Sequence, residues 1–371
     1  MKRNLYAVVM AGGKGTRFWP LSRPQRPKQL LKLLSAKSLL RETVDRVAPI
    51  FGHRNTLIVT VDEHHRAIRA DLPMLPKENF LIEPQGNNTA PCIGLAAVEI
   101  LARNPDAIMA VLPADHWVSD PRRFSRTLQA AVKLAGKRDA LITLGIRPAY
   151  PETGYGYILK GKKAGSVNGT AVYGVEGFAE KPPVTKALKL MRRGALWNSG
   201  IFIWRASTIL ASLGQYAPAV ARGLERIQKV ARGRGLATLP PKDLTVIRRE
   251  YRKMPNLSID YAVLEKAGSE GRVLTVEADF GWSDVGNWDA LHRMLPKDAD
   301  GNAGVGRWLA FRSSRCLAYS NKRLIALLGM ENAVVVDTPD ALLVADMRRS
   351  QEVKDLLEEL ARKGYGNYVV K

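Results

Sequence analysis

The sequence predicts an α/β fold with a doubly wound, mostly parallel twisted sheet, followed by a small β-rich domain. In the first half, short apolar runs with β-branched residues alternate with stretches of helical periodicity. After about residue 295, this alternation gives way to short β-runs separated by turns. The 371 residues suffice for two domains at roughly 150 residues each. We expect a large domain over residues 1–295 and a small one over residues 296–371.

The apolar runs of the first half hardly alternate with polar residues, so we expect strands that are buried on both faces. Amphipathic stretches lie between them, which is the pattern of βαβ units in a parallel sheet. Thr89 stands where one of these helices would be capped. The expected strands are Leu5–Met10, Thr56–Val61, Ala107–Leu112 and Ala140–Gly145, and the expected helices are Leu39–Val47, Pro91–Leu101 and Phe124–Ala135.

The middle and the end of the chain depart from this pattern. An antiparallel insertion is expected in the middle, where it can wall off a second substrate pocket beside the sheet. The small C-terminal domain follows a linker at Lys297–Asn302 and ends in a helix over Gln351–Arg362. Because so small a domain buries little core alone, we expect a homodimer through the C-terminal region. The remaining expected strands are Tyr155–Leu159, Ala171–Phe178, Cys316–Ser320, Leu324–Leu328, Ala333–Asp337 and Ala341–Ala345, with helices at Val184–Met191 and Ala206–Leu213.

The composition carries a large positive charge: 57 Lys and Arg against 35 Asp and Glu give a formal net charge of +22. Such a charge favours anionic partners, among them phosphorylated metabolites and nucleic acid. The basic residues are scattered, and the densest cluster, Arg222 to Arg234, follows a helical pattern with a solvated face. No zinc finger, RNP-type motif or basic tail accompanies it. We therefore expect small phosphorylated ligands and no nucleic acid.

Cysteine usage and hydropathy indicate a cytoplasmic protein with no membrane partner. Cys92 and Cys316 lack a metal-type spacing and are expected to be reduced, buried, small hydrophobes. No apolar run approaches the roughly 18 residues of a membrane helix. Lys2-Arg3 followed by Leu5–Met10 imitates a signal peptide, but the apolar part is too short and Lys14 follows it. This segment is expected to be the first strand.

The loop after that strand is rich in glycine and predicts a phosphate-binding turn. It reads Ala11-Gly12-Gly13-Lys14-Gly15-Thr16-Arg17, and its glycines let backbone N–H groups approach phosphate oxygens. It is not a Walker A loop, and Phe18 replaces the third glycine of a dinucleotide fingerprint. Arg17 and Lys28, which are joined by a proline-rich stretch, place two cations beside the turn. This combination suits a triphosphate that undergoes substitution at the carboxyl edge of the sheet.

Further motifs follow this loop in a recognisable order. With Arg26-Pro27-Lys28 they resemble those of the sugar-nucleotide pyrophosphorylases, and specifically the mannose-1-phosphate guanylyltransferases. The resemblance covers residues 5 to about 295 and continues more weakly beyond. Asn87 departs from the pattern, since many relatives are expected to have a basic residue there. The motifs are Glu83–Pro91, Leu112–His116, Pro151–Ile158, Glu180–Pro182, Trp197–Gly200, Ser258–Tyr261 and Trp282–Gly286.

The resemblance implies a Rossmann-like nucleotidyltransferase domain, with a left-handed β-helix as one form for the C-terminal domain. The implied reaction transfers GMP from GTP to α-D-mannose 1-phosphate and releases pyrophosphate. The sugar phosphate attacks the α-phosphorus in line, without a covalent intermediate and with help from Mg²⁺. Arg17, Lys28 and Asp115 are the implied catalytic residues.

The other implied site residues fall into nucleotide, sugar-phosphate and metal groups. Backbone carbonyls of the Glu83–Thr89 loop are expected to accept the hydrogen-bond donors of guanine. Asp115, at the end of a strand, could instead cap the following helix, and Asp260 is expected to have a structural role, in which it could brace Lys181. The nucleotide group is Ala11, Gly12, Gly13, Gly15, Thr16, Glu83, Asn88, Thr89 and Asp115; the sugar-phosphate group is Gly154, Glu180, Lys181 and Asn198; the metal group is Asp115 and Asp284.

Alternative functions stay open on the sequence alone. A related nucleotidyltransferase could act on a heptose or glucose phosphate. A non-catalytic subunit could bind GDP-mannose as a regulator, although the presence of Arg17, Lys28, Asp115 and Asp284 argues against this. Because only His292 lies beyond residue 116 among the histidines, we expect no phosphomannose isomerase activity.

Overall fold

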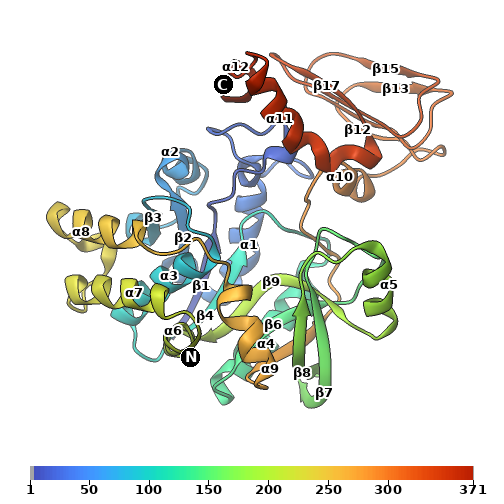
Figure 1. Cartoon of the computed structure of the whole chain (residues 1–371). Coiled ribbons are helices and arrows are strands. Elements are labelled where there is room, and N and C mark those ends of the chain that lie inside the picture. Colours follow the sequence, from blue (N-terminus) through green and yellow to red (C-terminus); the bar gives the residue numbers. More distant parts are fainter. Residues whose placement is uncertain (1–3, 371) are drawn as a thin grey trace.

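Apolar runs of the first half form one nine-stranded sheet in the computed structural model, which describes residues 4–370 (Figure 1). The four strands expected there are present within one residue at each end. Lys2 and Arg3, which open the segment that imitates a signal peptide, lie outside the described residues. The strands are β1 (Leu5–Met10), β2 (Thr56–Val61), β3 (Phe80–Glu83), β4 (Ile108–Pro113), β6 (Leu141–Ile146), β7 (Tyr157–Val167), β8 (Thr170–Ala179), β9 (Leu196–Arg205) and β10 (Val273–Ala278).

The strand order is β3-β2-β1-β4-β9-β6-β10-β8-β7. All of these strands point the same way except β9 and β8, which run antiparallel to their neighbours. The prediction of a mostly parallel sheet is therefore confirmed. The antiparallel pair β7 and β8 extends this sheet at its edge, because β8 pairs with β10.

Helices cover both faces of the sheet, as a doubly wound fold requires (Figure 1). Side chains of α3, α6 and α7 share one core cluster with Tyr6 and Val8, whereas side chains of α1 and α4 share another with Ala7. These faces alternate along β1 because successive side chains of a strand point in opposite directions. The helices are α1 (Leu39–Phe51), α2 (Asp62–Asp71), α3 (Thr89–Arg103), α4 (Pro121–Lys137), α5 (Val184–Arg192), α6 (Ala206–Tyr216), α7 (Pro218–Ala231), α8 (Pro241–Arg252), α9 (Glu265–Ser269) and α10 (Trp288–Met294).

The cap of α3 differs from the expectation by one residue. Asn88, with φ of 68°, caps the helix, and its side chain accepts a hydrogen bond from the Thr89 N–H group. Thr89 is the first helical residue, and its hydroxyl accepts from the Ile259 N–H group at 2.8 Å. An amide side chain caps well, and asparagine tolerates a positive φ, so it displaces threonine from this role.

The C-terminal part is a β-helix with a helical end, which confirms the predicted β-rich domain. Parallel ladders join β12, β14 and β16, and a second parallel ladder joins β13 and β15. The last predicted helix is shorter than expected, because a 3₁₀ turn (Met347–Glu352) precedes it. The elements are β12 (Ala303–Val305), β13 (Trp308–Phe311), β14 (Leu317–Ser320), β15 (Ile325–Leu328), β16 (Ala333–Asp337), β17 (Leu342–Asp346), α11 (Val353–Arg362) and α12 (Asn367–Val370).

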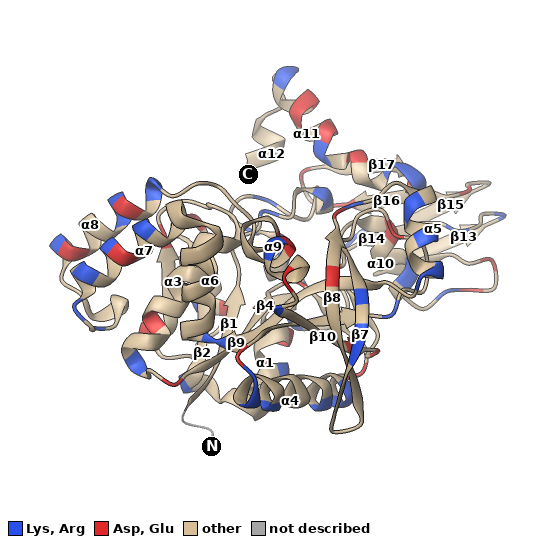
Figure 2. Cartoon of the chain, turned by 60° about the horizontal axis from the view of Figure 1, so that its bottom comes forward, with Lys and Arg blue, Asp and Glu red and all other residues tan. Residues whose placement is uncertain are grey.

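Charged side chains are spread over many elements, and Lys and Arg share α7, α8 and α11 with Asp and Glu (Figure 2). The basic cluster on α7 has the predicted buried face, which includes Val220, Leu224 and Ile227. Both cysteines are free and buried, as expected. Across residues 4–370, every helix is too short or too polar to cross a membrane.

Candidate active site

The glycine-rich loop connects β1 to a short 3₁₀ helix, Thr16–Phe18. Gly15 has φ of 63°, and a Cβ atom at this position would lie 2.0 Å from the Cβ atom of Lys28. Only glycine permits this close approach. Within residues 4–370, the N–H groups of Gly12, Gly13 and Gly15 donate to no protein acceptor. They are therefore available to phosphate oxygens, as a phosphate-binding turn requires.

Lys28 lies at the centre of a polar cluster beside this loop. Its side chain is only 7% exposed, and its Nζ atom lies 2.7 Å from Asp115 Oδ2. The same Nζ atom donates to the backbone oxygen of Asp284 at 2.6 Å. The Tyr155 hydroxyl donates to Asp284 Oδ1 at 2.8 Å. One ammonium group thus joins the segments that carry both expected metal ligands.

A short antiparallel pair explains why Asp115 and Asp284 meet although they are far apart in sequence. Asp115 lies two residues before β5 (Trp117–Val118), and Asp284 directly follows β11 (Trp282–Ser283). These two strands pair with each other, with Ser283 opposite Trp117. Asp115 caps no helix, and the N-cap of α4 is Asp120. The capping alternative for Asp115 is wrong.

Electrostatics keep Asp115 ionised and its neighbour His116 neutral. Burial raises the pKa of Asp115, but the charge of Lys28, its hydrogen bond and smaller contributions from neighbouring groups together outweigh burial and hold the pKa below its usual value. Burial lowers the pKa of His116 to about 4. The neutral imidazole accepts a hydrogen bond at Nδ1 from Trp282 Nε1, at 3.1 Å. His116 therefore orients the loop by hydrogen bonding.

The carboxylates of Asp115 and Asp284 fit a hard divalent cation. Mg²⁺ binds to proteins through one or two carboxylates and takes its other ligands from substrate phosphates and water. No cluster of three or more His, Cys, Asp and Glu side chains suited to a metal occurs in residues 4–370. The donor set thus matches a cation that arrives with a phosphorylated substrate better than one held in an all-protein cage.

Arg17 lies half-buried in the 3₁₀ helix that follows the glycine-rich loop. Its guanidinium forms no hydrogen bond or ion pair with another of the described residues. This differs from Lys28, whose Nζ atom already donates to Asp115 and to the Asp284 backbone oxygen. Arg17 is therefore free to contact a ligand without breaking a protein contact.

A pocket of about 220 Å³ opens beside the cluster, lined by residues of β9, of the segment before β7 and of the segment after β8. It contains every residue of the expected sugar-phosphate group, together with Thr89 and Asp284. Sequence reasoning assigned no role here to Tyr155 or Phe202; Tyr155 stands in a recognised motif, which could have indicated it. The residues that line the pocket include Thr89, Gly154, Glu180, Lys181, Asn198, Asp260 and Asp284.

Asn198 is held in one orientation in this pocket. Its Nδ2 atom donates to Asp260 Oδ1 at 2.7 Å, and its Oδ1 atom accepts from the Gly200 N–H group at 3.2 Å. Burial raises the pKa of Asp260 to about 6. Lys181 pairs instead with Glu180, at 2.7 Å. Asp260 thus has a structural role, as expected, but its carboxylate holds Asn198 and not Lys181.

Glu83 lies beside Gly12 of the glycine-rich loop and is almost fully buried. A Cβ atom on Gly12 would lie 3.4 Å from Glu83 Oε2, and the Tyr251 hydroxyl donates to Glu83 Oε1. Burial raises the pKa of Glu83 to about 7. Asn88 lies apart from this group, and its Nδ2 atom donates to Asn256 Oδ1 at 3.1 Å.

Asn87, the departure from the family pattern, has a structural role. It is buried, and its Nδ2 atom donates to the backbone oxygens of Tyr251 at 3.0 Å and Met254 at 3.2 Å. Its own carbonyl accepts from the Leu257 N–H group at 3.2 Å. A neutral amide satisfies two buried carbonyls here, and a buried cation would need a counter-charge.

Glu83→Gln is expected to flatten the pH dependence of stability between pH 4.5 and pH 7. Native Glu83 holds its proton up to about pH 7, whereas an ordinary glutamate loses it near 4.5. The native state then binds more protons in this window, so the free energy of unfolding falls as pH rises, by up to about 3 kcal/mol. Urea denaturation at pH 5 and pH 7.5 measures the fall. The exposed Glu63→Gln variant is the control, and equal slopes in wild type and Glu83→Gln would contradict the assignment.

Comparisons with known proteins agree with the two parts of the structure. Residues 6–301 match the nucleotidyl transferase family, and residues 306–360 match the MannoseP isomerase/GMP-like beta-helix domain. The xanthan biosynthesis protein XanB of Xanthomonas campestris pv. campestris is 39% identical over 96% of this chain and 73% of its own length. The mannose-1-phosphate guanylyltransferase of Escherichia coli K12 is 36% identical over 97% of this chain and 74% of its own length.

Solved structures show the same fold. A crystal structure from Thermus thermophilus, described as a mannose-1-phosphate geranyltransferase, matches with a TM-score of 0.85 and 35% identity. It covers 96% of this chain and 99% of its own. A structure described as mannose-6-phosphate isomerase from Helicobacter pylori matches with a TM-score of 0.57 and 26% identity, over 76% of this chain and 99% of its own.

Proposed function

The chain belongs to the nucleotidyl transferase family, and we propose that it transfers GMP from GTP to α-D-mannose 1-phosphate, giving GDP-mannose and pyrophosphate. The observation that carries this function is the position of Lys28, between the glycine-rich loop, the Asp115 carboxylate and the backbone oxygen of Asp284. The sugar-phosphate pocket opens beside this cluster and shares Asp284 with it. Relatives named for this activity cover nearly the whole chain.

The reaction needs positive charge and alignment more than it needs a base. A phosphate monoester has its second pKa near about 6, so the attacking oxygen is already ionised at neutral pH. Arg17 binds the β- and γ-phosphates, which leave as pyrophosphate, and Lys28 binds near the α-phosphate and the incoming phosphate. Both cations stabilise charge that builds up in the transition state. In-line attack then proceeds without a covalent intermediate.

Mg²⁺ is the cation that we propose for this site, with Asp115 and Asp284 as its protein ligands. Bound there, it supplies positive charge to the reacting phosphates. The protein's own contribution is to hold the segments of Asp115 and Asp284 together through Lys28, which contacts the Asp115 carboxylate and the Asp284 backbone oxygen. Tyr155 fixes the Asp284 carboxylate by donating to one of its oxygens.

Substrate selection is assigned to residues on either side of this cluster. Asn198, held by Asp260 and Gly200, presents its amide to sugar hydroxyls, and Glu180 accepts from them. Lys181 binds the sugar phosphate, where Gly154 lets the backbone come close. The nucleotide contacts the segments that contain Ala11, Gly12, Gly13, Gly15, Thr16, Glu83, Asn88 and Thr89.

The fate of each phosphorus atom tests this reaction. With GTP labelled at the α-phosphorus, we expect the label in GDP-mannose; with GTP labelled at the γ-phosphorus, we expect it in pyrophosphate. Protein quenched in acid during turnover is expected to carry no label. Label on the protein from α-labelled GTP would contradict the direct attack.

We propose that residues 1–295 act as the catalytic domain, residues 296–371 as a small second domain, and that the chain works in the cytoplasm. The free state of Cys92 and Cys316 supports that location.

We also propose a homodimer, formed through an apolar patch on the β-helix. Leu309, Phe311 and Leu328 lie on one face of the β13–β15 ladder and are 58%, 56% and 70% exposed, and Leu324 beside them is 64% exposed. Contiguous exposed apolar side chains are typical of association surfaces. Light scattering should give a dimer for the wild type and a monomer for Leu328→Glu. Val184→Glu, which changes an exposed side chain on α5, should stay dimeric. A monomeric wild type would contradict the proposal.

A further inference from the structure

Residues 18–27, here called the arm, connect Arg17 to Lys28 by way of the C-terminal domain. Trp19 donates from Nε1 to the backbone oxygen of Tyr368 at 2.8 Å, across most of the chain. Its carbonyl accepts from Trp288 Nε1 at 3.2 Å. The arm therefore leaves the active site, contacts the other domain and returns. Its apolar residues share one buried cluster with that domain, including Phe18, Trp19, Leu21, Leu317, Tyr319, Val334 and Val336.

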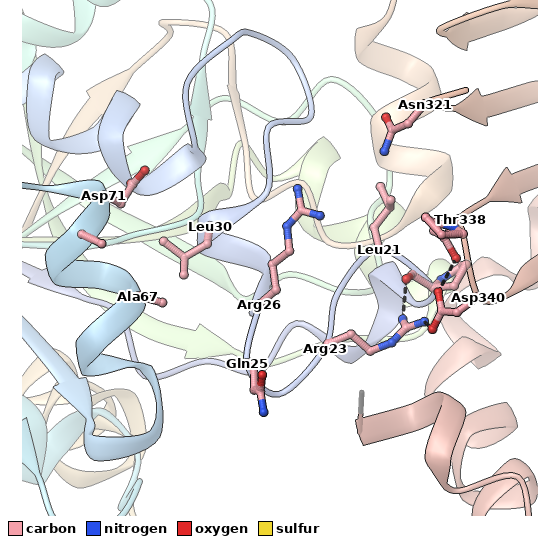
Figure 3. Close-up of a pocket in the computed structure, with 13 residues that line it drawn as sticks. Leu21, Arg23, Gln25, Arg26, Leu30, Ala67, Asp71, Asn321, Thr338 and Asp340 are labelled. Carbon is pink, nitrogen blue, oxygen red and sulfur yellow. Dashed lines mark hydrogen bonds and ion pairs between the residues drawn. The ribbon is translucent and has the colours of Figure 1, made fainter. Parts of the chain in front are cut away.

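The tip of the arm is a tight turn whose anchor is an ion pair. Arg23 and Arg26 exchange backbone hydrogen bonds of 3.0 and 2.9 Å. The Arg23 guanidinium donates to the backbone oxygens of Pro20 and of Ser22, the latter at 3.1 Å, and to Asp340 Oδ2 at 2.9 Å. One side chain thus closes the turn and joins it to the C-terminal domain (Figure 3).

Asp340 is itself held in place. It lies in the turn between β16 and β17, where its Oδ1 atom accepts from the Thr338 hydroxyl at 2.9 Å. The Ala341 backbone oxygen lies 2.7 Å from the same hydroxyl, whose single proton serves one of the two acceptors at a time. Both carboxylate oxygens of Asp340 are therefore engaged, one by its own turn and one by the arm. Asp340 is a fixed acceptor rather than a mobile surface group.

Burial makes this pair more than a surface contact. The burial is that of Arg23, whose side chain is 7% exposed; its carboxylate partner among the described residues, Asp340, is 43% exposed. A buried guanidinium that loses its counter-charge is strongly disfavoured. A groove of about 630 Å³ separates the tip from Ala67, Ala70 and Asp71 of α2 (Figure 3). The charged link of the tip therefore runs to Asp340, not to the helix across the groove.

A displacement of the tip of the arm would be transmitted directly to the active site. Lys28 begins a 3₁₀ helix straight after the arm, with Pro27 as the preceding residue. Gly15 of the glycine-rich loop lies against the stem of Lys28, where a Cβ atom would collide. The arm, Lys28 and the glycine-rich loop therefore share one set of contacts, and a displaced tip displaces two phosphate-binding elements.

We propose that Asp340 is a positioning residue for catalysis: by holding Arg23, the C-terminal domain sets the position of Lys28 and of the glycine-rich loop. The inference rests on the proposed function for its kinetic part. Its structural part, the order of the arm, is independent of which reaction the site performs. The C-terminal domain thus contributes to turnover within one subunit.

Kinetics of Asp340 variants test this proposal. Asp340→Ala is expected to lower kcat by about tenfold or more, because small displacements of aligned groups are costly. The KM for mannose 1-phosphate should change by less than about twofold, since the pocket for the sugar is untouched. Arg23→Ala combined with Asp340→Ala should lose little more than either alone. Asp340→Glu should recover part of kcat. Glu331→Gln, which removes the partner of Arg315 in the same domain, is the control.

Hydrogen exchange of the arm supplies a readout that does not depend on activity. Amides of residues 18–30 should exchange faster in Asp340→Ala than in wild type and Glu331→Gln, with unchanged exchange in the central strands. Asp340→Asn, which keeps the shape of the side chain, serves if the alanine variant does not fold. Wild-type kcat in Asp340→Ala, or lost kcat with unchanged exchange of the arm, would overturn the proposal. A wild type without guanylyltransferase activity would refute the proposed function, and the exchange data alone would then decide on positioning.

Discussion

Lys28→Ala is expected to lower kcat by about 10²–10³-fold, the largest effect of any single substitution considered. The ammonium group is a preorganised cation for the reacting phosphates, and such groups contribute roughly 3–4 kcal/mol to transition-state stabilisation. It also joins Asp115 to the backbone of Asp284, so its loss leaves a half-buried carboxylate without its partner. KM values for both substrates should change less than kcat. Steady-state kinetics at saturating Mg²⁺ measure both parameters.

Two further variants separate charge from packing at this position. Lys28→Met keeps most of the stem against which Gly15 packs, so it should lose as much kcat as the alanine variant while the protein stays more stable. Lys32→Ala, an exposed lysine close by in the chain, should behave as wild type. Near wild-type turnover in Lys28→Met would show that the charge is not used.

Asp115→Asn is expected to lose activity most severely at low Mg²⁺ and to recover partly at high Mg²⁺. The substitution keeps the shape of the side chain but removes the charge that pairs with Lys28 and that would hold the cation. A weaker metal ligand shifts the Mg²⁺ concentration for half-maximal activity upwards. The measurement is a titration of kcat against Mg²⁺ from micromolar to tens of millimolar.

A matched variant controls for the loss of one negative charge. Asp106→Asn lies on an exposed loop before β4 and should give the wild-type titration. If Asp115→Asn kept near wild-type kcat at every Mg²⁺ concentration, Asp115 would be neither a metal ligand nor a catalytic residue.

Local sequence patterns predicted the parallel strands β1, β2, β4 and β6 but missed β3, β10 and the antiparallel β9. Strand β9 reads LWNSGIFIWR, and its polar Asn198 and Ser199 interrupt the apolar run because Asn198 serves the pocket. Gly200 has φ of 67°, which adds a further irregularity. A strand that carries site residues thus loses the pattern by which strands are recognised. The start of α3 is a second place where the local pattern misled: the cap is Asn88, with its positive φ, and not the expected Thr89.

The site residues were named from motifs, but their contacts were out of reach of the sequence. Nothing in the spacing of Tyr155 and Asp284 indicates that the two are hydrogen bonded, since 129 positions separate them. Arg23 and Asp340 are 317 positions apart. Arg23 belongs to the arm, and Asp340 stands in no recognised motif of the nucleotide site. Such pairs depend on how the domains pack, which no local periodicity encodes.

The transfer of GMP from GTP to mannose 1-phosphate is tested by one assay. It measures pyrophosphate release with each of four nucleoside triphosphates combined with each of several sugar 1-phosphates, with Mg²⁺ present. If the protein is a mannose-1-phosphate guanylyltransferase, GTP with mannose 1-phosphate should release far more pyrophosphate than every other combination. No pyrophosphate should be released without a sugar phosphate. Faster release with a glucose or heptose phosphate would assign the pocket of Asn198 and Glu180 to another sugar. If no combination released pyrophosphate, the proposed enzymatic activity would be contradicted. The protein would then be one that binds these ligands without turning them over.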